Sequence, residues 1–101
     1  GAGTSGRIAV QDGVELEPTY GWPRERLLFV MAGGAIALTE SVEGAEDDAH
    51  AGRSAMIEHG VGPHDVVIGV AASGRTPFTV ALLDQARSAG ALTIAVANNP
   101  A

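Results

Sequence analysis

The chain has 101 residues, of which 46% are hydrophobic but only 4% aromatic, and its formal net charge is −6. This hydrophobicity is too high for a disordered chain of that charge, and an acidic balance without a basic stripe argues against a nucleic-acid partner. No cysteine is present, which excludes disulfides and thiolate metal sites. The composition favours one α/β domain in which small aliphatic residues let helices approach a parallel sheet.

No apolar run is long enough to cross a bilayer, and the chain does not open on a basic segment followed by an apolar one, as a secretory signal does. We therefore expect a cytoplasmic protein with no membrane partner. The chain begins with Gly1-Ala2-Gly3-Thr4-Ser5-Gly6, a phosphate-loop type of sequence that normally follows the carboxyl end of a strand. Because no strand precedes it, we expect an interior segment of a longer protein.

Apolar runs alternate along the chain with segments that favour helices. We expect a short helix over 7–14, a buried strand over 27–32, and a helical stretch over 35–41 and 45–59 that is interrupted near Gly44. Two further strands follow at 66–71 and 92–97, on either side of a helix over 77–89. The strands are continuously apolar, which is typical of strands covered on both faces, and their spacing leaves room for the crossovers of a parallel sheet.

A first candidate site lies between the second expected strand and the next helix, at Ala71-Ala72-Ser73-Gly74-Arg75-Thr76-Pro77. Ligands of open parallel sheets bind at such strand ends, where backbone N–H groups and the positive helix end favour phosphate. Alternatively, the segment is an ordinary turn in which Thr76 caps the helix, Pro77 takes its first position and Gly90 ends it. The residues alone do not decide, although a plain turn does not require Ser73 or Arg75.

The opening segment, Gly1 to Gly6, matches the pattern G-x-G-x-x-G, which is a weak signal by itself. A dinucleotide site also needs an acid at the end of the next strand to hold a ribose hydroxyl, and Gly33-Gly34 stand there instead. The hydroxyls of Thr4 and Ser5 favour a sugar or phosphate ligand.

Carboxylates gather at Glu43-Gly44-Ala45-Glu46-Asp47-Asp48, and Glu15 follows the first helix. Acids in a first helical turn complement the helix dipole, which accounts for Asp47 and Asp48, and an exposed loop accounts for Glu15. A catalytic acid or base must lie where its pKa is tuned, and the residues alone do not single one out. The three histidines have no metal-ligand spacing, so no metal site is expected.

Together these residues resemble the N-acetylmuramic acid 6-phosphate etherase family, in order and spacing over nearly the whole chain. The matching segments are Gly1 to Arg7, Glu15 with Pro18-Thr19-Tyr20-Gly21, Ala32-Gly33-Gly34, Val42 to Asp48, and Asp65 to Pro77. The resemblance implies a sugar-isomerase domain, which is a three-layer α/β/α sandwich around a parallel sheet. Residues 1–101 would form part of a single such domain.

The resemblance also implies an activity, which is cleavage of the lactyl ether of N-acetylmuramic acid 6-phosphate to N-acetylglucosamine 6-phosphate and D-lactate. The family performs it during recycling of cell-wall sugars, without metal or organic cofactor, and as a homodimer with sites near the subunit boundary. Elimination from the opened sugar is followed by addition of water. Carried over by motif, Glu46 is expected to be the base and Glu15 the acid. The expected substrate-binding residues are Thr4, Ser5, Ser73, Gly74, Arg75 and Thr76.

Two departures from the family pattern keep other functions open. Leu16-Glu17 follow Glu15, where the family has a small residue and a proline. The strand before Gly1 and the later portion that closes the site are absent. A non-catalytic phosphosugar-binding regulatory domain is therefore the alternative. A phosphosugar isomerase is a further one, which the paired glutamate motifs disfavour.

Overall fold

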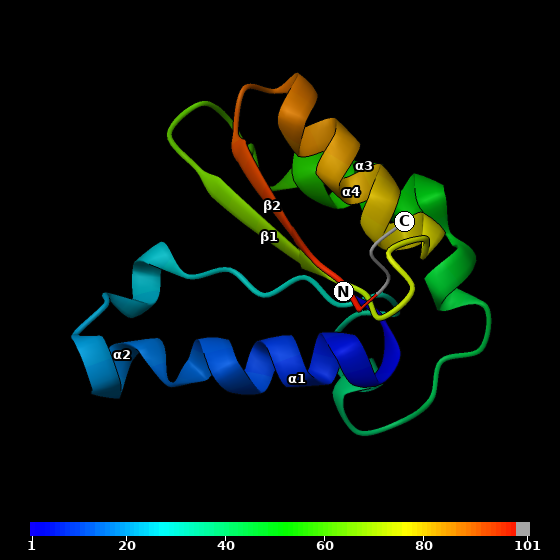
Figure 1. Ribbon diagram of the computed structural model, residues 1–101, viewed down its shortest axis with the longest axis horizontal. Coiled ribbons are helices and arrows are strands. Elements are labelled where there is room, and N and C mark those ends of the chain that lie inside the picture. Colours follow the sequence, from blue (N-terminus) through cyan, green and yellow to red (C-terminus); the bar gives the residue numbers. More distant parts are fainter. Residues whose placement is uncertain (99–101) are drawn as a thin grey trace.

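The fold is organised around two parallel strands (Figure 1), and the computed structural model describes residues 1–98. The strands are β1 (Val66–Val70) and β2 (Leu92–Val96), and the α-helices are α1 (Gly3–Val14), α2 (Leu16–Tyr20), α3 (Ala49–Glu58) and α4 (Pro77–Ser88). Single 3-10 turns are η1 (Arg24–Arg26), η2 (Ala35–Leu38) and η3 (Ala45–Asp47). The predicted α/β class with a parallel sheet is confirmed.

The β1–α4–β2 unit forms as the apolar runs predict. Val66 of β1 lies opposite Leu92 of β2, and Val70 lies opposite Val96. The crossover helix α4 covers one face of the pair and buries Phe78, Ala81, Leu82 and Ala86. A side chain at Gly69 would lie 2.7 Å from Leu83 of α4, so the missing Cβ lets the helix approach the sheet.

Helix α3 packs on α4 at a crossing that needs a glycine. A Cβ built on Gly52 would overlap the carbonyl oxygen of Phe78 and lie 3.1 Å from its carbonyl carbon. Met56 of α3 joins Phe78, Leu82 and Ala86 in the buried cluster. The two helices therefore touch backbone to backbone, and this contact anchors the layer that covers the sheet.

The strand expected over 27–32 is not present as a strand. The segment is extended, but among residues 1–98 its only sheet-like bonds are with Gly1. The amino group of Gly1 donates to the carbonyl of Val30 at 3.0 Å, and its carbonyl accepts from the N–H of Ala32 at 2.9 Å. Extended backbone becomes a strand only when a neighbour pairs with it along its length. The apolar run was therefore identified correctly as extended, and its assignment as a strand was wrong for this chain.

Three helix boundaries also differ from expectation. Helix α1 begins at Gly3 rather than near Arg7, so the glycine-rich opening forms a first helical turn and not a loop. The stretch expected over 35–41 forms only the 3-10 turn η2, and the stretch over 45–59 divides into η3 and α3. The second break falls at Asp48, whose carboxylate accepts a hydrogen bond from the N–H of Ala51 at 2.9 Å and caps α3.

The sheet face opposite α4 is largely open in this chain. Helix α1 lies on that side and contacts β1, but alternate residues of both strands stay exposed (Figure 1). They are Val66, Ile68, Leu92, Ile94 and Val96, at 43–61% exposure. The described part of the chain contains no helix long and apolar enough to span a membrane.

Thr79 has an unusual place in α4, because it is 3% exposed and its hydroxyl oxygen has no hydrogen-bond partner within residues 1–98. A buried hydroxyl without a partner costs about 1–3 kcal/mol. Thr79→Val keeps the shape and the β-branch, so we expect the free energy of unfolding in urea to rise by about 1 kcal/mol. Thr19→Val on exposed α2 is the control, with a change below about 0.5 kcal/mol. Loss of stability in Thr79→Val would contradict an unpaired hydroxyl.

Candidate functional site

Two helix starts meet at the carboxyl end of β1. A Cβ placed on Gly1 would lie 2.6 Å from the carbonyl oxygen of Val70, so the segment that leads into α1 touches the last residue of the strand. The loop that leads into α4 leaves the strand at the same point, and the end of β2 joins it through the bond from the N–H of Asn98 to the carbonyl of Ala72 at 3.0 Å. The two hydroxyl-bearing segments predicted from the sequence are thus brought together.

The loop into α4 is fixed by its own backbone. Gly74 has φ of 70° and donates to the carbonyl of Ala71 at 3.1 Å, and the Ser73 hydroxyl accepts from the N–H of Arg75 at 3.1 Å. A left-handed φ is accessible to glycine without strain, which explains the residue type at position 74. Thr76 occupies the N-cap position as predicted, yet its side chain makes no capping hydrogen bond.

The start of α1 carries Thr4 and Ser5 in its first turn. Gly6 behind them is buried, and a Cβ there would lie 2.5 Å from the sulfur of Met31 and 2.8 Å from Gly1. The first turn of α1 is therefore packed on the extended segment 27–32, and this contact holds Thr4 and Ser5 at the end of β1.

The electrostatics of the two helix starts favour an anion. Neither α1 nor α4 is capped by a side chain, and neither has an acidic residue in its first turn. The free N–H groups of a helix start, together with the positive end of the helix dipole, bind phosphate. Two such ends at one strand terminus offer a local anion site in a chain whose formal net charge is −6.

Arg7 has a role that the sequence did not reveal. Its Nε donates to the carbonyl of Ala37 at 3.0 Å, and its Nη2 donates to the carbonyl of Glu40 at 3.3 Å. The side chain thus fixes to α1 the segment that precedes residues 42–48, which we call the acidic loop. The sequence shows an arginine in the matching motif, but its partners lie 30 and 33 residues away, and no local pattern identifies them.

Arg75 belongs to the loop that leads into α4, where its N–H donates to the Ser73 hydroxyl. With Arg53 and Asp84 it lines a shallow groove of about 400 Å³ between α3 and α4. The residues predicted to bind substrate, Thr4, Ser5, Ser73, Gly74, Arg75 and Thr76, all belong to the two segments that meet at β1, and Arg75 also lines this groove.

Glu46 lies in η3, which contacts α4, and its side chain is exposed. The acidic loop around it is held at both ends, by Arg7 before it and by the Asp48 cap after it. Inside the loop, Val42 packs on Gly33, where a Cβ would lie 2.8 Å from the Val42 side chain. The loop is therefore positioned, while the Glu46 carboxylate remains accessible.

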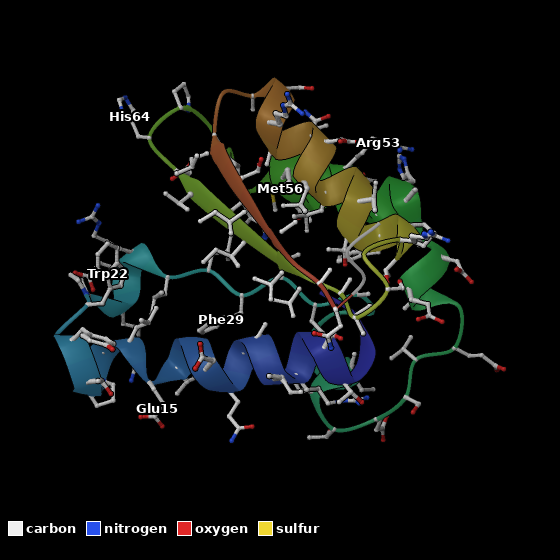
Figure 2. All side chains as sticks on the ribbon, viewed as in Figure 1. Glu15, Trp22, Phe29, Arg53, Met56 and His64 are labelled. Atoms are coloured by element: carbon white, nitrogen blue, oxygen red, sulfur yellow. The ribbon has the colours of Figure 1, made fainter. Side chains whose placement is uncertain are left out.

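Glu15 lies far from the rest of this site. It is the residue at the C-terminal end of α1, eleven positions after Thr4, which corresponds to about 16 Å of helix rise. Figure 2 shows its exposed side chain pointing away from the sheet. The structure therefore does not bring Glu15 together with the hydroxyls of Thr4 and Ser5 within one chain.

A cleft of about 610 Å³ contains none of the predicted site residues. Its walls include Phe29, Val42, Ala55 and Phe78, and its carboxylates are those of Glu43 and Asp48. The negative charges of these two carboxylates disfavour a phosphate, so we assign the candidate site to the helix starts instead. No group of three His, Cys, Asp or Glu residues that could hold a metal ion occurs within residues 1–98.

Comparisons with known proteins give this site a family context. The profile of the family described as glucokinase regulatory protein N-terminal SIS domain matches residues 1–87. Similar proteins named N-acetylmuramic acid 6-phosphate etherase come from Deinococcus radiodurans (52% identical over 100 residues, 99% of this chain), Mesorhizobium japonicum (50% over 101 residues, 100%) and Symbiobacterium thermophilum (53% over 100 residues, 99%). The chain spans 33% of each of these relatives.

Proposed function

Because this chain belongs to the family of the glucokinase regulatory protein N-terminal SIS domain and resembles the etherases along its length, we propose that it is the phosphosugar-binding part of an N-acetylmuramic acid 6-phosphate etherase. The proposed enzyme is cytoplasmic, acts in recycling of cell-wall sugars and works as a homodimer. The observation that carries the proposal is the meeting of two uncapped helix starts, with Thr4, Ser5, Ser73 and Thr76, at the end of β1.

In this proposal the helix starts hold the phosphate and two carboxylates move the protons. Glu46 takes the proton from C2, which bears the acetamido group, and the electron pair of that bond forms the C2–C3 double bond. The C3–oxygen bond breaks, and the departing lactate oxygen receives the proton of Glu15. Water then adds to C3, with one proton returning to Glu15 and the proton on Glu46 returning to C2. One of the carboxyl groups must start ionised and the other protonated, which requires different surroundings for each.

The test of this function uses the chain and a hybrid in which it replaces the matching third of the Deinococcus radiodurans etherase. We expect the hybrid to release lactate from N-acetylmuramic acid 6-phosphate. We also expect the phosphorylated sugar at about 100 times its Kd to stabilise the chain by about 2.7 kcal/mol in thermal unfolding. The same sugar without phosphate is the control and should cause a much smaller shift, because the helix starts bind the phosphate.

A non-catalytic regulatory domain is the second candidate function. It is favoured by the match to a regulatory protein's domain and by the distance between Glu15 and the helix starts within one chain. A phosphate-dependent thermal shift without lactate release from the hybrid would establish this function. Lactate release would exclude it.

A further inference from the structure

The groove of about 400 Å³ between α3 and α4 adjoins the candidate site. Gly52, near the start of α3, meets the backbone of Phe78, the second residue of α4, so the two helices begin side by side. The groove includes Ala49 and Pro77, which are the first residues of the two helices, and Arg75 of the loop into α4. One end of the groove is therefore built from the same loop that supplies hydroxyls to the candidate site.

Two arginines make this groove cationic. Arg53 of α3 and Arg75 are both exposed, and they line the groove with one carboxylate, that of Asp84 on α4. Figure 2 shows Arg53 on the side of the helix layer away from the two strands. The groove thus has a surplus of positive charge in a chain whose formal net charge is −6. The cleft of about 610 Å³ differs from it, because Glu43 and Asp48 lie in its walls.

Neither guanidinium is held by an acceptor of the described chain. Within residues 1–98, Arg7 donates to two backbone carbonyls and Arg24 pairs with Glu17, but no hydrogen bond or ion pair involves the side chain of Arg53 or Arg75. A guanidinium presents five N–H donors in a planar fork that matches a carboxylate, and charged hydrogen bonds of this kind are the strong ones. The groove therefore offers unused donors to an anion.

Apolar side chains in the groove favour a carboxylate that is attached to a short hydrocarbon group. Val80, which is 40% exposed, and Ala81 line the groove beside the arginines. A methyl group packed on these side chains leaves water, while the carboxylate next to it keeps charged hydrogen bonds with the guanidiniums. A phosphate has no apolar part and gains nothing from these side chains.

We propose that this groove binds a carboxylate of the same ligand whose phosphate lies at the helix starts, with Arg53 and Arg75 as specificity-determining residues. The inference rests on the proposed function. The lactyl group of N-acetylmuramic acid 6-phosphate carries a methyl group and a carboxylate, and it is attached at C3, across the sugar ring from the phosphate on C6. N-acetylglucosamine 6-phosphate lacks the lactyl group, so it would leave the groove empty and bind more weakly.

Titration of the chain with these two sugars tests the proposal, in a Glu46→Gln background so that no sugar is consumed. We expect the lactyl sugar to bind at least about tenfold more tightly, because hydrogen bonds to charged groups contribute at least this factor. Arg53→Gln should remove this advantage and leave the affinity for N-acetylglucosamine 6-phosphate within about twofold. Arg53 is varied rather than Arg75, because Arg75 also belongs to the loop at the phosphate site.

Three further variants separate loss of charge from damage to the fold. Arg87→Gln is the matched control, because Arg87 is exposed in the last turn of α4 and is not among the residues that line the groove, so neither affinity should change. Arg53→Lys keeps the charge and should retain part of the advantage. Asp84→Asn removes the carboxylate of the groove and should raise the affinity for the lactyl sugar about threefold, which structural damage would not do.

Equal affinities for the two sugars in the Glu46→Gln chain would overturn the carboxylate subsite and leave the phosphate site standing. A loss in Arg53→Gln that is the same for both sugars would overturn it too, because the effect would not depend on the lactyl group. Binding of neither sugar would instead refute the phosphate site, and with it both the proposed function and this subsite.

Discussion

Replacing Gly52 with alanine is expected to lower the free energy of unfolding by at least about 3 kcal/mol, although helix propensity alone predicts a gain of about 1 kcal/mol. The two effects have opposite signs, so the experiment decides between them. The added methyl group would meet the carbonyl oxygen of Phe78 and lie 3.2 Å from the backbone nitrogen of Leu82. Both are backbone atoms inside α4 and neither can move alone, so α3 and α4 must separate.

The matched control is Gly62→Ala, because Gly62 has no left-handed φ and the nearest atom to an added Cβ is 3.9 Å away. This substitution should be neutral or stabilise by up to about 1 kcal/mol, since it reduces the freedom of the unfolded chain. Urea denaturation of both variants measures the difference. Equal midpoints for Gly52→Ala and the unmutated chain would show that α3 and α4 are not in backbone contact.

Replacing Glu46 with glutamine is expected to lower lactate release by the hybrid by about 10²–10⁴-fold, the range that general acid–base catalysis contributes. Glutamine keeps the size and the exposed position in η3 but cannot accept the C2 proton. In the proposed function the helix starts of α1 and α4 hold the phosphate and η3 does not, so the thermal shift with the phosphorylated sugar should remain.

Glu40→Gln is the matched control for this variant, because Glu40 lies just before the acidic loop and contributes only its backbone carbonyl to the Arg7 contact. Its lactate release should stay within about threefold of the unmutated hybrid, since no proton transfer is assigned to its side chain. Turnover retained in Glu46→Gln would remove Glu46 from the base role. Loss of both turnover and ligand-induced stabilisation would indicate damage to the loop instead.

The elements that the sequence predicted well are those whose signals are local. The β1 and β2 strands and α4 agree to within one residue, because continuous apolar runs, Pro77 at a helix start and Gly90 after a helix end act over a few positions. The segment 27–32 was misassigned because pairing depends on a neighbour distant in sequence, and the only sheet-like partner in the described chain is Gly1. Glycines at positions 1, 3 and 6 indicated a loop, yet packing on Met31 favours a helical turn.

In the candidate site, too, the features with local sequence signals were predicted and those that depend on distant residues were not. Its position at the end of β1 follows from the rule for parallel sheets and was predicted from Ser73 and Thr76. The contact of Gly1 with Val70 and the fastening of the acidic loop by Arg7 join segments at least 30 residues apart, and no local pattern encodes them. The separation of Glu15 from Thr4 depends on how far α1 extends, and the helix proved longer than its sequence signals suggested. The roles of Glu15 and Glu46 remain predictions.

The α3–α4 contact also has a consequence for how the chain folds. Five of the six residues in the buried cluster, Met56, Phe78, Leu82, Ala86 and Ala91, come from one continuous stretch, and only Ala32 comes from the first half. Closing short loops costs less entropy than closing long ones, so the half from α3 to β2 can assemble first, before α1 docks through Arg7 and Gly1. Local opening of the first half would then leave the second half folded. In such an opening the start of α1 would leave the end of β1 and return to it without global unfolding of the chain.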